Sequence, residues 1–162
     1  MKKLNKFTVD LKKDHIELLN LINSFRKAVE ASHQDRAKEI LERMDNLASG
    51  HFNFEEIYLY PRLRRMIMQV TKSLCNEQKI LGEFIFRSRC LLKKNNLSRN
   101  GLRGILEMLP RLSKLFAECD SLTSLIKKFG KEDKEDLNQR FYEFRKTKNW
   151  SISKSFRERR FE

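Results

Sequence analysis

The sequence contains few of the residues that interrupt helices. Only five glycines and two prolines occur among 162 residues. A sheet protein would need more turn residues and more alternation of β-branched with polar positions. Charged residues make up 35% of the chain, so the composition indicates long amphipathic helices. The length fits a single domain with a sizeable core.

Long apolar runs and paired cysteines are also missing. No stretch of about 18 apolar residues occurs, so no segment is predicted to span a membrane. The first residues form no apolar stretch, so we do not expect a signal peptide. Cys75, Cys90 and Cys119 are widely spaced, odd in number and without a CxxC pair. This argues against a disulfide framework or a zinc ribbon and indicates reduced thiols. We therefore expect a cytoplasmic protein.

The motifs of common enzyme classes are not recognisable either. The chain shows no phosphate-binding loop, no glycine-rich dinucleotide fingerprint and no nucleophile–base pair, so we do not expect a conventional enzyme. Its formal charge of +13 allows association with nucleic acid, anionic lipid or an acidic protein. Cations interleaved with aromatic residues after about residue 145 could contact a nucleic acid or an acidic protein partner. The alternative for this basic tail is a disordered, solubilising segment.

Apolar residues recur at a spacing of three and four in several successive segments, which is typical of amphipathic helices. Four long helices joined by short loops predict an all-α protein with an up-down-up-down four-helix bundle. We expect this bundle to cover residues 8–129. A C-terminal extension, residues 131–162, should hold a short fifth helix and then the basic tail. The expected helices span 8–30, 32–65, 66–94, 102–129 and 132–146.

Residues 51–61, HFNFEEIYLYP, combine a histidine and a carboxylate at helical spacing. His51 and Glu55 lie four residues apart and so project from the same helix face, in line with the apolar stripe upstream. In the first helix, His15 falls on the inner stripe between Leu11 and Leu18. A buried imidazole and carboxylate need a partner, and helical bundles build metal sites from such pairs. A salt-bridged or hydrogen-bonded core histidine without metal is the alternative.

Gly50, Pro61 and Gln78 each lead to an expectation about the local structure. Gly50 costs about 1 kcal/mol relative to alanine in a helix interior, which favours close approach of a neighbouring helix. Pro61 is expected to bend the turns around it. Gln78 is a polar residue at an inward position of the third helix.

The sequence resembles the hemerythrin family, the HHE cation-binding bundles. The resemblance rests on His15 in an early helix, on His51 with Glu55 and Glu56 in an HxxxEE arrangement, and on the Leu-Tyr-Pro that follows at 59–61. In that family the bundle core holds a non-haem di-iron centre. Histidines come from all four helices, and carboxylates bridge the two irons.

The resemblance implies metal ligands at four positions. His15 matches the first-helix histidine, His51 the second-helix histidine and Glu55 the bridging carboxylate. Asp120 fits the carboxylate position of the fourth helix. The resemblance also implies iron as the cofactor, as one or two non-haem ions.

Two positions depart from the family pattern. Gln78 stands about where a third-helix histidine should be, and Leu115 stands where the fourth-helix histidine should be. With at least two histidines missing, we expect a reduced site. Gln78 could add a weak ligand through its amide oxygen, and Cys75 or Cys119 could add a thiolate, although both thiols are typical core cysteines.

We therefore predict a metal-binding, hemerythrin-like protein with a reduced or degenerate site. The resemblance implies a role in sensing or handling oxygen, nitric oxide or iron, with a metal ion and a diatomic molecule as partners. One alternative is a metal-free structural or partner-binding bundle in which the same side chains form a hydrogen-bonded cluster. Another is a basic, nucleic-acid-associated protein.

Overall fold

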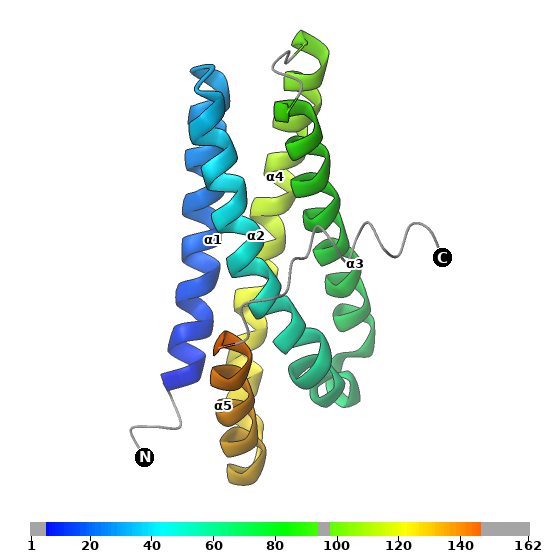
Figure 1. The fold of residues 1–162 in the computed structure, drawn as a ribbon. Coiled ribbons are helices and arrows are strands. Elements are labelled where there is room, and N and C mark those ends of the chain that lie inside the picture. The colour runs from blue at the N-terminus through cyan, green and yellow to red at the C-terminus, as the bar shows by residue number, and fades with distance from the viewer. Residues whose placement is uncertain (1–5, 94–97, 147–162) are drawn as a thin grey trace, which may run out of the picture.

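The computed structural model describes residues 6–93 and 98–146, apart from the side chains of Arg99, Asp120 and Ser121. This part of the chain is almost entirely helical and contains no strand, as the sequence predicts. In chain order the elements are α1 (Lys6–Glu30), α2 (Gln34–Phe54), η1 (Glu55–Leu59), α3 (Tyr60–Lys93), α4 (Arg99–Leu122), η2 (Thr123–Lys128) and α5 (Lys131–Lys146) (Figure 1).

The four long helices form an antiparallel bundle. α1 packs against α2 and α4, and α3 packs against the same two helices, so the four close a ring. The chain runs alternately up and down through them (Figure 1). The predicted up-down-up-down bundle is confirmed, and its interior is filled by the apolar stripes of the four helices.

The chain reverses direction inside the span of α3. Ile67 has φ −146° and ψ 54°, which are not helical values. The turns before Ile67 therefore continue the arm of α2 and η1, and those after it form the third arm of the bundle. This break lies within two residues of the boundary that the sequence predicts, between residues 65 and 66.

The fifth helix extends the bundle core. Leu137 and Phe141 of α5 are buried, and the Phe141 ring lies 6.2 Å from that of Phe7 and 5.1 Å from that of Phe54. α5 contacts α1, α2 and η1. The division into a bundle at 8–129 and an extension at 131–162 remains a prediction. The basic, aromatic tail after Lys146 lies outside the described residues.

No helix in the described part of the chain is both long enough and apolar enough to cross a membrane. One local expectation is wrong: no neighbouring atom lies within 4 Å of the position that a Cβ on Gly50 would occupy. This glycine therefore faces open space and does not mark a close helix contact.

Candidate metal centre

A π-helical segment shapes the second arm of the bundle at the HxxxEE motif. η1 covers Glu55–Leu59, and the amide of Tyr60 donates to the carbonyl of Glu55, five residues back. Pro61 follows directly; a proline has no N–H to donate and its ring clashes with the carbonyl four residues earlier. Widening the preceding turn accommodates the proline, and such π-bulges are frequent at functional sites. The expected distortion near Pro61 thus takes this form.

The π-helical turn brings Glu55 and Tyr60 to the same side of the arm. Residues five apart in a regular α-helix project about 140° away from each other. Here the hydroxyl of Tyr60 donates to Oε2 of Glu55 at 2.8 Å, and both side chains are buried. The local backbone therefore places a hydrogen-bond donor beside the carboxylate.

Three side-chain atoms of the kinds that bind metal ions converge in the bundle interior, one each from α1, α2 and η1. His15 Nε2 lies 2.8 Å from His51 Nε2. Oε1 of Glu55 lies 3.3 Å from His51 Nε2 and 3.7 Å from His15 Nε2. All three residues are only 2% exposed. Lone pairs that converge in this way, shielded from water, need a cation between them, either a proton or a metal ion.

The spacing of these three atoms fits one metal ion. Two ligands bonded at about 2.1 Å to the same ion lie about 3.0 to 3.4 Å apart in octahedral or tetrahedral geometry. The observed edges of 2.8, 3.3 and 3.7 Å bracket that range. Imidazole nitrogen and carboxylate oxygen are also ligands that first-row transition metals accept.

The other oxygen of Glu55 faces protein donors. Its Oε2 accepts hydrogen bonds from the hydroxyl of Tyr60 at 2.8 Å and from Nε2 of Gln78 at 2.6 Å. The same amide nitrogen of Gln78 donates to the Tyr60 oxygen at 2.6 Å. Gln78 therefore presents its NH₂ group to the site and not the amide oxygen that could bind a metal.

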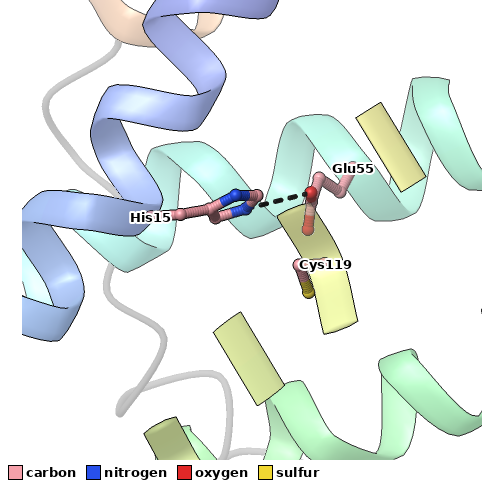
Figure 2. A group of neighbouring side chains, drawn as sticks. All are labelled: His15, Glu55 and Cys119. Carbon is pink, nitrogen blue, oxygen red and sulfur yellow. Dashed lines mark ion pairs between the residues drawn. The ribbon is translucent and has the colours of Figure 1, made fainter. Parts of the chain in front are cut away.

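Cys119 of α4 is the fourth residue beside the site. One donor atom each from His15, Glu55 and Cys119 lie within 4.8 Å of one another, and the three side chains converge between the helices (Figure 2). The Sγ atom of Cys119 lies 3.9 Å from the hydroxyl oxygen of Tyr60. Burial and the charge of Glu55 raise the pKa of the Cys119 thiol far above its usual range, so without a metal ion it is a neutral thiol.

Aromatic rings form the wall around the two imidazoles. The ring of Phe116 lies 6.4 Å from that of His15, and the ring of Phe52 lies 5.3 Å from that of His51. Phe52 and Phe116 stack on each other with an interplanar angle of 8°. This apolar wall excludes water and strengthens the electrostatic interactions within the site.

The charges in the site stabilise one another. Burial alone would lower the pKa of His51, but the carboxylates of Glu55 and Asp14 outweigh it and raise that pKa to about 9. Burial would likewise raise the pKa of Glu55, but His51 and His15 hold it well below its usual range. Glu55 is therefore an anionic acceptor at neutral pH.

The structure brings together three of the four residues predicted as ligands, His15, His51 and Glu55. The fourth, Asp120, lies in α4 directly after Cys119, but its side chain is outside the described part of the structure. Cys75 does not belong to the converging set found among the described residues. The ligand roles of all four remain a prediction.

Sequence reasoning missed Asp14. Its Oδ2 accepts a hydrogen bond from Nδ1 of His51 at 3.2 Å, and the residue is 5% exposed. The signal was available, because Asp14 lies three residues after Leu11 and four before Leu18, on the same inner stripe as His15.

A comparison with family models decides the affiliation of the chain. The model described as the hemerythrin HHE cation binding domain matches residues 7–119. The chain belongs to this hemerythrin family. The matched span covers nearly all of the four long helices, includes the converging His15, His51, Glu55 and Cys119, and ends before α5.

Membership in the hemerythrin family supports metal-cation binding by this bundle, as the name of the domain states. The donor set fits that property, with two imidazoles and one carboxylate aimed at a common point. Neither the curated proteins nor the solved structures include a match to the chain.

Proposed function

We propose that this hemerythrin-like bundle binds a single divalent transition-metal ion through His15, His51 and Glu55. The observation that carries the proposal is the division of the Glu55 carboxylate. Its Oε1 faces the two imidazoles, whereas its Oε2 accepts hydrogen bonds from Tyr60 and Gln78. A carboxylate that bridges two ions usually gives one oxygen to each. With Oε2 engaged by protein donors, the site has room for one ion.

We propose iron(II) as this ion. Two histidines and one carboxylate on one face of an ion, with further positions left open, are typical of non-haem iron(II) sites. A structural zinc site would need four protein ligands, whereas a zinc site with an open position can use the same two histidines and one carboxylate. The fourth neighbour here is the neutral thiol of Cys119. Asp120 remains a proposed additional ligand from the same turn of α4.

An iron(II) ion bound here would supply open coordination positions and one-electron redox chemistry. We therefore propose a role in sensing or handling oxygen, nitric oxide or iron. The three cysteines, all free in the structure, fit a reducing compartment, and we propose a cytoplasmic location on that basis.

One observation favours a second candidate, a metal-free structural bundle. Glu55, His51 and Gln78 are hydrogen-bonded to one another or to near neighbours of the protein. Buried polar clusters of this kind can also serve to fix the packing of a core. The two candidates make different predictions for the unmodified protein.

An anaerobic titration separates them. Chelator-treated protein should bind one iron(II) ion per chain, and its melting temperature should rise. The stabilisation is about 2.7 kcal/mol at a free ion concentration a hundred times Kd. His51→Ala should abolish both effects. His33→Ala is the matched control, because His33 is exposed, and it should bind like the wild type. No binding by the wild type would support the metal-free bundle, and two ions per chain would contradict the single-ion proposal.

A further inference from the structure

A line of polar contacts runs from the C-terminal helix to the proposed metal ligands. Near the end of α5, Arg145 forms an ion pair with Oδ1 of Asp14 on α1. Oδ2 of Asp14 accepts a hydrogen bond from Nδ1 of His51 at 3.2 Å. The other nitrogen of that ring, Nε2, faces His15 and Glu55. The Nε2 side of the His51 imidazole thus faces the proposed metal site, and the Nδ1 side faces Asp14 and, through it, α5.

Asp14 is held between two fixed partners. A carboxylate this deeply buried is rare unless it is paired, and its two oxygens are divided between Arg145 and His51. Because it contacts Nδ1, on the opposite side of the ring from Glu55, Asp14 lies outside the set of converging donors. Its position is that of a residue that orients a ligand.

Such an orienting contact has a known physical effect on a histidine ligand. When Nδ1–H donates to a carboxylate, the proton stays on Nδ1 and the lone pair on Nε2 points towards the metal. The hydrogen bond also fixes the plane of the ring and makes the imidazole a stronger ligand. Arg145 holds Asp14 in turn, because a guanidinium is always charged and its direction is set by the fork of its N–H groups.

The docking of α5 does not depend on Arg145. Leu137 and Phe141 are buried in the bundle core, Arg62 of α3 pairs with Asp133 and Asp136 on α5, and α5 is further tied to α1 by a Tyr142 hydrogen bond. The Arg145 side chain, 38% exposed, therefore contributes a small share of the contacts that hold the helix. Its distinctive contact is the one to Asp14.

We propose that Asp14 and Arg145 are positioning residues for His51, so that α5 sets the metal affinity of the bundle. The inference rests on the proposed function, since it needs a metal ion at His15, His51 and Glu55. It adds a part of the chain that the family match does not cover, because the match ends at residue 119 and α5 begins at Lys131.

The test is an anaerobic titration of the full chain with cobalt(II), followed by its visible absorption. Cobalt(II) accepts the same nitrogen and oxygen ligands as iron(II). Removing a partner that orients a ligand costs about 10- to 100-fold in metal affinity, so Asp14→Asn should lose affinity in that range. Arg145→Gln should lose about tenfold, at the lower end of the same range. Arg145→Lys keeps the charge and should recover part of that loss.

A double variant distinguishes positioning from a general structural effect. If Arg145 acts only through Asp14, Asp14→Asn combined with Arg145→Gln should bind cobalt no more weakly than Asp14→Asn alone. If each residue merely stabilises the fold, the two losses should add. Arg140→Gln is the control on the same helix. Arg140 forms ion pairs with Asp136 and Glu143 of α5 and stacks over the ring of Tyr58, away from Asp14, so this variant should bind like the wild type.

Different variants test the proposed metal binding and the positioning role of Asp14 and Arg145. If the wild type binds no cobalt, or binds it equally well after His51→Ala, the proposed function is wrong and the inference with it. If the wild type binds cobalt through His51 while Arg145→Gln and Asp14→Asn bind it unchanged, only the inference is overturned. Should Asp14→Asn fail to fold, as judged by circular dichroism, the Arg145 pair of variants still decides, because full affinity in Arg145→Gln contradicts the proposal.

Discussion

The hydroxyl of Tyr60 donates to Oε2 of Glu55 across a π-helical turn, at a distance of 2.8 Å. The same hydroxyl accepts from Nε2 of Gln78. One phenol group therefore links the second and third arms of the bundle at the carboxylate. Burial, and then the negative charge of Glu55, raise the pKa of Tyr60 well above its usual value.

Replacing Tyr60 by phenylalanine should destabilise the metal-free protein. The ring volume is kept, but Glu55 loses one donor and the Gln78 amide loses an acceptor in a buried setting. A buried polar group left without its partner costs about 1 to 3 kcal/mol, and urea denaturation should measure a loss of that size. Tyr58→Phe is the control, since no hydrogen bond from its hydroxyl to a described residue is found and that ring is only half-buried. Equal losses in both variants would contradict the argument.

The contact between Tyr142 of α5 and Asp10 of α1 should give a pH-dependent stability. The Tyr142 hydroxyl donates to Oδ2 of Asp10 at 2.7 Å. This bond is the largest cause of the lowered pKa of Asp10. For Tyr142, burial and then the same bond raise the pKa to about 12. Tyr142→Phe should therefore cost about 1 kcal/mol at pH 7, less than the roughly 1.5 to 3 kcal/mol of a buried bond to a charged group, because the pair is partly exposed.

The sign of the pH dependence follows from the two shifts. The lowered pKa of Asp10 stabilises the fold above its unfolded value of 3.8, and this contribution is lost as the pH falls through the folded value. The raised pKa of Tyr142 contributes stability below 10, which is lost as the pH rises towards 12. Urea denaturation should thus show a difference between wild type and Tyr142→Phe at pH 7 that shrinks at pH 3. A constant difference would indicate ring packing instead.

Phe141 should matter to the whole bundle and not only to α5. It is 1% exposed and contacts the rings of Phe7 and Phe54 from two other helices. Phe141→Ala removes a large buried ring, which typically costs about 3 to 5 kcal/mol. Circular dichroism should show one cooperative transition at a lower temperature. Ile16→Ala, at a side chain 57% exposed, is the control and should change little. A separate early transition of a short helix would show that α5 unfolds independently.

The sequence was sufficient for the bundle because its helices are long and strongly periodic. The inward positions of His15, Leu18 and Gln78 follow from spacing alone, and the reversal at Ile67 was placed within two residues. The helical repeat also put His51 and Glu55 on one face, which the 3.3 Å contact between them confirms.

The finer chemistry of the site could not be derived from periodicity. The π-helical turn changes the angular relation of Glu55 and Tyr60, and regular helical spacing does not anticipate it. The orientation of the Gln78 amide depends on which neighbour is an anion. The Asp14–Arg145 pair joins residues 131 positions apart, so only the packing of α5 against α1 reveals it.

Two substitutions should restore the second ion position that this site is proposed to have lost. Gln78→His combined with Leu115→His replaces the amide donor at Oε2 of Glu55 and adds an imidazole from α4, one turn before Cys119. Without the Gln78 donor, the Tyr60 hydroxyl is the remaining donor to Oε2, and it can turn away when a cation binds; the two new imidazoles supply nitrogen ligands for that cation. The double variant should bind two iron ions per chain and gain a near-ultraviolet absorption band on exposure to oxygen. Gln78→His alone is the matched control and should stay at one ion, since it adds a single ligand. If the double variant also stays at one ion with an unchanged spectrum, the second half of the site was not lost at Gln78 and Leu115, and the single-ion character of this bundle has another origin.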